Sequence, residues 1–541
     1  MQFYTNNIAK QTKHSRIVLI GNELTRKLEV YGESESFFIP SALFFSREGD
    51  YMSINLNAVE VEVRERRLKS IISYHGTAKD LTERSKTRSL GCGSRSYQQC
   101  SDCSQGCAET VTYMIKDSAV VVHSPIGCCS STSPANVQAG VVTKARGLEP
   151  QKVRVICTNI LEKDTVYGGL PKLREAVEEA IRRFKPSAVF VHSSCAAGIV
   201  GDDIDSEANA LEDEYGIPVI PVFCEGFKSR IWSSGFDAGF HGILKKIVKP
   251  PQKKQKDLVN IFNFEGSDTF GPLLSKLGLR ANYVVPLATV DTISKMSEAA
   301  CTAHICETLA TYVAKGLEQE HGVPEVKAPA PFGISWTDQW LREVAKYTGK
   351  EDIVEQVIVS EHERIRPGLE EVREKLKGKK VYVFAGDSFA HSLANIANDL
   401  GLELLGITTL HHDQRTDGDV EGLDTLNHLV KSRGDVKNFN VCNKQPYQVV
   451  KFLRKLNPDL LIVRHMNMTI LGTKLGIPTV LEGDANISAG YDGVAKLGNR
   501  LYEVMQTKRV LQNIAEHFEW PYTDWWLEHE NPYYFEEEEA Q

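Results

Sequence analysis

Twelve cysteines indicate the chemistry that this chain could carry, and seven of them fall between residues 92 and 157. The segment CGSRSYQQCSDCSQGC contains Cys92, Cys100, Cys103 and Cys107. Its CxxC pair resembles half of a zinc site, but no second pair follows at the usual separation. Iron–sulfur clusters take thiolates from distant loops. The clustering therefore favours iron–sulfur ligation, and Cys103, Cys128 and Cys195 could meet at one face of a domain.

A separate cysteine, Cys306, opens an amphipathic helical segment that ends at Gly322, in the stretch CETLATYVAKGLEQEHGVP. Free cysteine is among the most buried residue types, so this thiol could simply pack in the core. A thiolate is also the soft ligand that an iron–sulfur cluster prefers. The residue alone leaves both interpretations open. Cys301 is interpreted as a core thiol on the preceding turn.

The elements that must position these thiols are indicated by short apolar runs that alternate with helical patterns. The runs cover residues 118–127, 152–160, 187–195 and 217–227. Their apolar character predicts buried parallel strands, and this order predicts an α/β fold class with doubly wound parallel sheets. Cys128, Cys195 and Cys224 follow strand ends, where open α/β sheets bind their ligands.

The same alternation continues beyond a Pro/Lys linker at residues 248–257 and beyond a charged helical stretch at 361–380. Four regions are therefore predicted: an N-terminal extension at 1–91, and α/β domains at 92–250, 251–375 and 376–541, the last with an acidic tail. Met52 is expected to begin a helical stretch. Residues 1–51 are interpreted as an upstream segment that need not be translated, with a family-specific extension as the alternative.

Composition excludes some partners and compartments. The formal net charge of −8 and the pI of about 6.1 argue against nucleic-acid binding, which calls for a basic surface. No apolar run reaches the length of a membrane span. The N-terminus lacks the apolar segment and cleavage site of a secretory signal. A cytoplasmic protein with reduced thiols is expected.

Four motifs, taken in series, carry a resemblance to a known family. IKDSAVVVHSPIGCC, TNILEKDTVYGGLPKL, SSCAAGIVGDDI and CEGF resemble successive signatures of the nitrogenase component 1 superfamily, over about residues 92–515. The resemblance implies an α-type chain of three Rossmann-like domains around a metallocluster site, paired with a homologous β-type subunit as α2β2. It further implies a P-cluster-like [8Fe-7S] cluster shared with that subunit. Its ligands from this chain would be Cys103, Cys128 and Cys195, with Cys100 and Cys107 as alternatives for the first.

The resemblance also implies a role for Cys306. In the family, a helix-opening cysteine sixteen residues before a Gly-Ile/Val-Pro binds the catalytic cofactor, and Cys306 precedes Gly322 by sixteen residues. Nitrogenase α chains hold the other end with a histidine. The matching segment GIPTVLEGDANISAGYDG has none, and carries Glu482, Asp484 and Asn486 instead. A nitrogenase-cofactor-like iron–sulfur cluster without Mo or V is expected, with His465 as a candidate for the missing imidazole.

The predicted pocket departs from nitrogenase in a consistent direction. A glutamine and a histidine above the cofactor align with Trp232 and Phe236. The Gly-Gly-Leu-Arg turn that reaches the cofactor corresponds to Gly386, Asp387, Ser388 and Phe389. An aromatic wall suits an organic substrate better than dinitrogen. Ordinary core packing is the alternative interpretation of these aromatic side chains.

Within the superfamily, the chain resembles the catalytic α-type subunit of methylthio-alkane reductase. This implies reductive C–S cleavage of a small organic thioether, giving methanethiol and a hydrocarbon. Electrons would come from an ATP-dependent [4Fe-4S] reductase homodimer. The chain has no Walker A motif, so ATP hydrolysis would fall to that partner. The alternatives are a non-enzymatic iron–sulfur cofactor assembly scaffold of the nitrogenase system and, third, a divergent nitrogenase.

Overall fold

A computed structural model gives the structure of the chain. It describes residues 53–91, 103–130, 132–263, 268–418, 420–442, 446–483 and 486–528, and the backbone at 18–22 and 25–29. The chain divides into two compact units, Met1–Asp50 and Tyr51–Gln541. In the first unit, β1 (Val18–Asn22) and β2 (Thr25–Glu29) form an antiparallel hairpin. Cys92, Cys100, Asp484 and the acidic tail lie outside the described residues.

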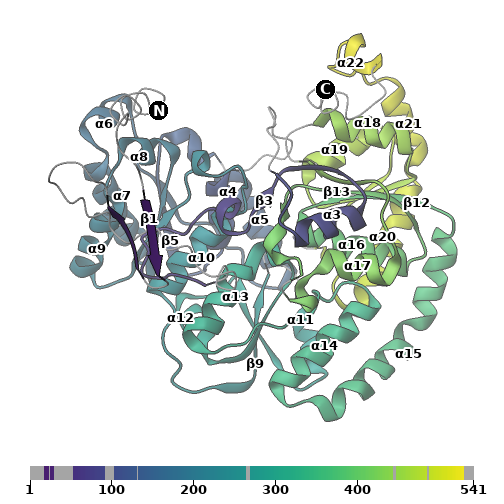
Figure 1. Cartoon of the computed structure of the whole chain (residues 1–541), viewed down its shortest axis with the longest axis horizontal. Coiled ribbons are helices and arrows are strands. Elements are labelled where there is room, and N and C mark those ends of the chain that lie inside the picture. Colours follow the sequence, from purple (N-terminus) through teal and green to yellow (C-terminus); the bar gives the residue numbers. More distant parts are fainter. Residues whose placement is uncertain are drawn as a thin grey trace. The chain divides into compact units, whose positions relative to one another are not determined.

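The first parallel sheet has the order β6-β5-β7-β8. Figure 1 labels its strand β5 and the helices α7 and α9. Its strands are β5 (Ser118–His123), β6 (Val155–Cys157), β7 (Ala188–Ser193) and β8 (Val219–Phe223). The helical segments around it are α4 (Ser104–Thr112), η1 (Ile126–Cys129), α5 (Thr132–Ala145), α6 (Glu162–Tyr167), α7 (Leu170–Phe184), α8 (Cys195–Val200), α9 (Ile204–Tyr215), η2 (Gly226–Lys228) and α10 (Ser234–Lys246). Successive residues of β5 alternate between the faces: Val121 joins the core under α7 and α9, and Val122 joins the core that includes α4 and α10.

The second parallel sheet has the order β10-β9-β11. Its strands are β9 (Gln255–Phe262), β10 (Arg280–Val285) and β11 (Ala299–His304). The accompanying helices are α11 (Phe270–Ser275), α12 (Val290–Ser294), η3 (Met296–Glu298), α13 (Glu307–His321), α14 (Ile334–Thr348) and α15 (Glu351–Leu376). Cys301 lies within β11, paired with Val259, so its predicted position on a helical turn is wrong, although it is fully buried as expected of a core thiol.

The third sheet has the order β17-β16-β12-β13-β15-β4. Its parallel strands are β12 (Lys380–Ala385), β13 (Glu403–Thr409), β15 (Phe439–Cys442), β16 (Leu460–Val463) and β17 (Thr479–Leu481). Its helical segments are α16 (Asp387–Asp399), η4 (Gln414–Thr416), η5 (Glu421–Leu423), α17 (Thr425–Arg433), α18 (Pro446–Leu456), α19 (Met466–Lys474), α20 (Gly490–Met505), α21 (Lys508–Glu516) and α22 (Asp524–Glu528). The prediction of an α/β fold with doubly wound parallel sheets is confirmed; the predicted domain boundaries stay predictions.

The segment that follows Met52 joins these layers. It contains α2 (Arg64–Arg67), β3 (Ser70–Ile71), β4 (Ser73–Gly76) and α3 (Ala78–Lys86). β4 pairs antiparallel with β15 and so covers an edge of the third sheet, while β3 pairs with β14 (His412–Asp413). The prediction of a helical stretch from Met52 is wrong, because α2 is the single helix between residues 53 and 76. Its Arg64 and Arg67 are buried.

Each parallel sheet has one point at which the strand order reverses. The reversals lie between β5 and β7, between β9 and β11, and between β12 and β16. Ligands of open α/β sheets bind in the crevice at such a point, beyond the carboxyl ends of the strands. The segments after these strands are therefore where a site is expected.

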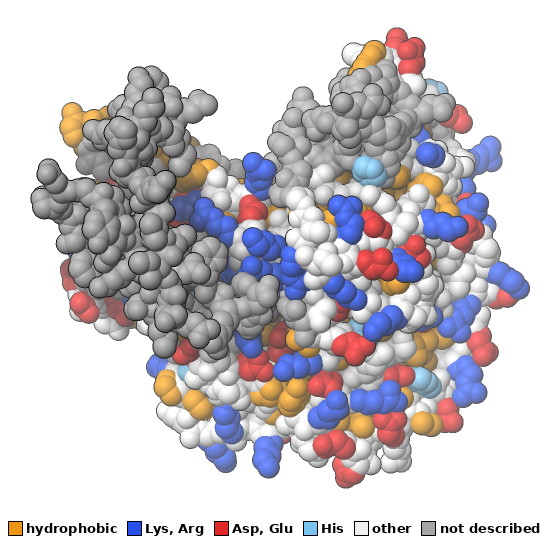
Figure 2. All heavy atoms as spheres, viewed as in Figure 1, with side chains coloured by type: hydrophobic (Ala, Val, Ile, Leu, Met, Phe, Trp, Pro, Cys, Tyr) orange, Lys and Arg blue, Asp and Glu red, His pale blue; other side chains and the backbone are white. Residues whose placement is uncertain are grey.

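Acidic and basic side chains are interspersed on the face drawn in Figure 2. None of the described helices combines the length and the apolar character that spanning a membrane would require.

Candidate functional site

The three predicted cluster thiols gather at the reversal point of the first sheet. Cys128 lies in η1 directly after β5, Cys195 begins α8 after β7, and Cys103 is the N-cap of α4. A Cβ placed on Gly226 would lie 3.6 Å from the Cys103 Sγ and 3.7 Å from the Cys195 Sγ. Burial, and then the nearby Cys103 and Cys195 thiols, raise the pKa of Cys128. The structure thus brings the three thiols together, beside a glycine that leaves space for them.

These thiols open to the surface through an apolar rim. Cys103 and Cys128 are exposed, and Cys195 is half-buried. Beside them, Ile126 and Ile199 are exposed by 64% and 77%. Large exposed apolar side chains around one point are typical of a protein interface. Cys107, an alternative first ligand, is buried in α4.

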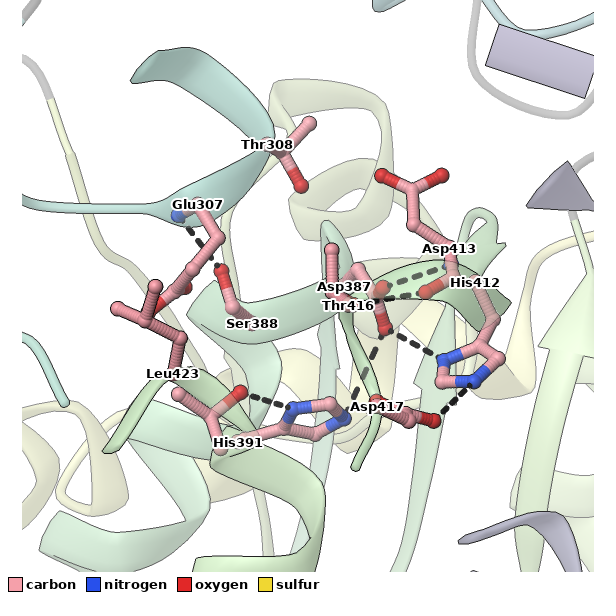
Figure 3. Close-up of a pocket in the computed structure, with 11 residues that line it drawn as sticks. Glu307, Thr308, Asp387, Ser388, His391, His412, Asp413, Thr416, Asp417 and Leu423 are labelled. Carbon is pink, nitrogen blue, oxygen red and sulfur yellow. Dashed lines mark hydrogen bonds and ion pairs between the residues drawn. The ribbon is translucent and has the colours of Figure 1, made fainter. Parts of the chain in front are cut away.

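Cys306 lies at the reversal point of the second sheet, between β11 and α13. It is the N-cap of α13 and is 6% exposed. The Ser388 hydroxyl donates a hydrogen bond to the Cys306 Sγ at 3.4 Å. The backbone N–H of Glu307 donates to the Ser388 Oγ at 3.2 Å, as Figure 3 shows. Ser388 belongs to the first turn of α16, which follows Gly386 at the reversal point of the third sheet. The structure therefore brings Cys306 against the predicted 386–389 turn.

A buried polar cluster continues from this turn (Figure 3). Asp387 accepts a hydrogen bond from the backbone N–H of Asp413 at 3.2 Å and pairs with His412 Nδ1 at 3.3 Å. His412 Nε2 lies 2.9 Å from Asp417. Burial lowers the pKa of His412, but Asp417 and Asp387 outweigh burial and raise it well above its usual range. A cavity of about 10 Å³, room for a single water molecule, lies between this cluster and Glu307.

Trp232 is the centre of an aromatic and imidazole group. Three rings pack edge-on around it, with centroid distances of 5.8 Å to Phe236, 5.7 Å to His411 and 6.1 Å to His465. His411 follows β13, and His465 is the N-cap of α19 after β16. Burial lowers the pKa of His465 to about 3, so its imidazole is neutral. Phe389 packs edge-on against Phe332, at 5.3 Å between centroids.

Arg64 was missed by the sequence analysis and is fully buried. Its guanidinium donates to Asp237 at 2.7 and 2.8 Å, to Asp413 at 3.0 Å and to the carbonyl oxygen of Thr308 at 2.5 Å. Asp237 lies on α10, Thr308 on α13 and Asp413 on β14. One arginine from α2 therefore joins α10, which packs on the first parallel sheet, α13, which follows β11 of the second, and β14, which follows β13 of the third.

Residues 476–493 contain no histidine, and their Glu482 is held by neighbouring polar groups. Glu482 is fully buried and accepts hydrogen bonds from the Ser488 hydroxyl at 3.0 Å and the Ser488 backbone N–H at 3.1 Å. It also pairs with Arg500. Burial raises the pKa of Glu482 to about 7. Its oxygens are therefore engaged by neighbours that also follow β17.

Known proteins resemble this chain along much of its length. The nitrogenase molybdenum-iron protein alpha chain of Methanosarcina barkeri is 30% identical over 315 residues, which are 55% of this chain and 58% of that protein. The nitrogenase iron-molybdenum cofactor biosynthesis protein NifE of Methanococcus maripaludis is 27% identical over 418 residues, 75% of this chain and 83% of that protein.

The fold has a solved counterpart. The structure of nitrogenase Cp1 at pH 6.5 superposes with a TM-score of 0.66 at 21% identity, covering 88% of this chain and 99% of that one. At this identity the likeness concerns the fold. The family described as nitrogenase component 1 type oxidoreductase matches residues 103–506, and the chain belongs to that family.

Proposed function

We propose that this chain is the catalytic α-type subunit of a nitrogenase-like reductase that cleaves the C–S bond of methylthio-alkanes. The reaction is R–S–CH3 + 2 e⁻ + 2 H⁺ → R–H + CH3SH. The observation that carries the proposal is an aromatic group that reaches, through His411, the helix that Cys306 opens. Trp232 packs on His411, which contacts Thr308 at 3.4 Å, two residues after Cys306. Large apolar rings there suit an organic substrate.

The donor atoms near Cys306 support a bound iron–sulfur cofactor. Among the described residues, buried polar atoms without a hydrogen-bond partner include Trp232 Nε1, Glu307 Oε1, His411 Nδ1 and His465 Nε2. Buried polar groups are normally satisfied, so these atoms favour a further group in this interior. Thiolate and imidazole suit a cluster of iron and sulfur. Because the cavity is about 10 Å³, side chains around it must move to admit one.

The side chains then have separate tasks. When bound, the cluster would supply the two electrons that C–S cleavage consumes. The Ser388 hydroxyl stabilises a Cys306 thiolate by donating to its sulfur. Burial raises the pKa of Glu307, so that its carboxyl group keeps a proton to a higher pH than an exposed glutamate does. Trp232 and Phe236 exclude water and offer ring edges and faces to a thioether sulfur.

The proposed partners follow from the surface thiols. We assign Cys103, Cys128 and Cys195 to a P-cluster-like [8Fe-7S] cluster shared with a homologous β-type subunit, in an α2β2 assembly that covers the apolar rim. An ATP-dependent [4Fe-4S] reductase homodimer would deliver the electrons. The catalytic cluster would contain no Mo or V. In this chain, the segment that corresponds to the heterometal-binding segment of nitrogenase, residues 476–493, has no histidine.

A cofactor assembly scaffold is the second candidate function. The likeness to a cofactor biosynthesis protein over 75% of this chain favours it. A scaffold would hold a cluster at Cys306 and release it, without turning over a thioether.

The deciding experiment uses the chain purified with its β-type partner. Ethyl methyl sulfide, the reductase and ATP are added, and ethane and methanethiol are measured by gas chromatography. We expect both products in equal amounts, dependent on ATP and reductase. Iron-replete protein that forms no ethane but restores activity to cofactor-free nitrogenase would establish the scaffold role instead.

Replacing a surface thiol should remove the interface cluster. In Cys195→Ala, we expect loss of most iron assigned to that cluster and weaker α–β association, because the thiolates join the chains through the metal. Iron analysis and size-exclusion chromatography measure both. Cys157→Ala, which alters another partly exposed thiol of the same sheet, should retain its iron. Equal iron in Cys195→Ala and the unmodified complex would contradict the assignment.

Trimming the aromatic group should change substrate selectivity. In Trp232→Phe or Phe236→Leu, we expect the ratio of kcat/KM values for a larger and a smaller thioether to shift by about 10–200-fold, the range that one methylene of a hydrophobic pocket supplies. Phe270→Leu is the control, because Phe270 is buried against Trp340. It should lower stability without altering the ratio. An unchanged ratio in both pocket variants would support simple core packing.

A further inference from the structure

His411 packs beside Trp232 in the interior, and one of its ring nitrogens has no hydrogen-bond partner among the described residues. The residue is fully buried. Its Nε2 lies 3.4 Å from the Thr308 hydroxyl and 3.7 Å from the Asp413 carboxylate. Its Nδ1 is buried and has no hydrogen-bond partner among the residues that the structure describes. The hydroxyl and the carboxylate both lie near Nε2, so Nδ1 is the ring nitrogen that remains available as a donor atom to a further group.

The carboxylate beside His411 is itself held in place. Arg64 Nη1 donates to Asp413 Oδ2 at 3.0 Å, and the Ser70 hydroxyl donates to Asp413 Oδ1 at 2.5 Å. Asp413 therefore cannot turn away from the imidazole without breaking both bonds. A histidine whose second nitrogen faces a fixed carboxylate is the usual arrangement of a metal-ligating histidine, because the carboxylate sets the tautomer and the ring orientation.

A simple cation site at this position fits less well. Donor atoms of Asp387, His411 and Asp413 lie within 4.8 Å of one another. However, Asp413 already faces the Arg64 guanidinium, and Asp387 already faces His412 and the Asp413 backbone N–H. A divalent ion would have to displace or approach these cationic groups. The bare Nδ1 of His411 is the donor that remains.

Thr308 relates the His411 ring to Cys306. The Thr308 hydroxyl contacts His411 Nε2, which places the imidazole ring against the first turn of α13, whose N-cap is Cys306. We propose that His411 Nδ1 is an imidazole ligand to an iron atom of the cluster bound by Cys306, supplied by the segment after β13 and not by residues 476–493, which contain no histidine. This inference rests on the proposed cluster at Cys306 and is independent of the thioether substrate.

His465 is the competing imidazole. Its Nε2 is also buried without a partner and its ring also packs edge-on against Trp232. It lacks the supporting carboxylate: among the described residues, no ion pair or hydrogen bond joins its ring to an acidic side chain, in contrast to His411 and Asp413. The structure therefore favours His411 as the oriented ligand.

Pulsed electron paramagnetic resonance of the reduced α–β complex tests the assignment. Labelling with ¹⁵N-histidine identifies a nitrogen coupled directly to the cluster. We expect this coupling in the unmodified complex, in His465→Gln and in His362→Gln, and its loss in His411→Gln. His362 is the matched control, because it forms a partly exposed His–Asp pair, 2.9 Å from Asp338. Coupling that persists in His411→Gln, or disappears only in His465→Gln, would overturn the proposal.

A second variant is needed in case His411→Gln loses the cluster altogether, because the nitrogen coupling could not then be measured. His411→Cys restores a soft ligand, so we expect it to recover iron and the resonance signal without the nitrogen coupling. Failure to recover the cluster would count against ligation by His411. Iron analysis of the unmodified complex and of Cys306→Ala tests the cluster on which the His411 proposal rests. Equal iron in both would reject a cluster at Cys306. Activity on thioethers is not measured, so failure of the proposed reaction would leave this result unaffected.

Discussion

Cys306→Ala is expected to abolish thioether reduction while leaving the iron bound by Cys103, Cys128 and Cys195 in place. Cys306 is buried at the start of α13 and accepts a hydrogen bond from Ser388. The other three thiols lie at the reversal point of a different sheet. Removing Cys306 need not release the iron bound by the other three thiols, because the two sets of ligands share no residue.

The measurement combines product formation with iron content. Ethane from ethyl methyl sulfide should fall below detection, and the iron lost should be that of one cluster. Cys301→Ala is the matched control: this thiol lies on β11 and is fully buried. It should keep its activity and its iron. A fully active, folded Cys306→Ala complex would return Cys306 to a packing role and remove the main support for catalysis by this chain.

Arg64→Ala is expected to lower the free energy of unfolding by about 3–5 kcal/mol, because removing one partner of a buried ion pair leaves uncompensated buried charge. Asp413 would lose its guanidinium partner, and the carbonyl oxygen of Thr308 would lose a donor. Asp237 would keep Arg67 at 2.5 Å. The damage should therefore be greatest between α13 and β14, where the proposed cofactor ligands lie.

Urea unfolding followed by circular dichroism measures this loss as a lower midpoint. Arg280→Ala is the control, since Arg280 pairs with Asp257 at the surface, where the two side chains are 57% and 50% exposed. An exposed pair is worth less than about 1 kcal/mol. Similar midpoints for the two variants would contradict a stabilising role for the buried pair.

Most strands could be predicted from apolar runs, because parallel strands covered on both faces are apolar almost throughout. The run at residues 187–195 contains β7, and that at 118–127 contains β5. β4 was missed because its sequence, SYHG, is a polar edge strand. The helical stretch after Met52 was predicted from its charges, but burial of Arg64 against Asp237 and Asp413 decided its structure.

The sequence by itself determined which thiols exist, that Cys128 and Cys195 follow strands, and that Cys306 begins a helix. These features depend on local periodicity and on neighbours in the chain. Only the tertiary structure decided that Ser388 meets Cys306 across 82 residues and that Arg64 meets Asp413 across 349. It also decided that His411 Nδ1 is buried without a hydrogen-bond partner among the described residues. Burial and pairing of a polar side chain depend on elements that pack around it, and no local pattern records which elements those are.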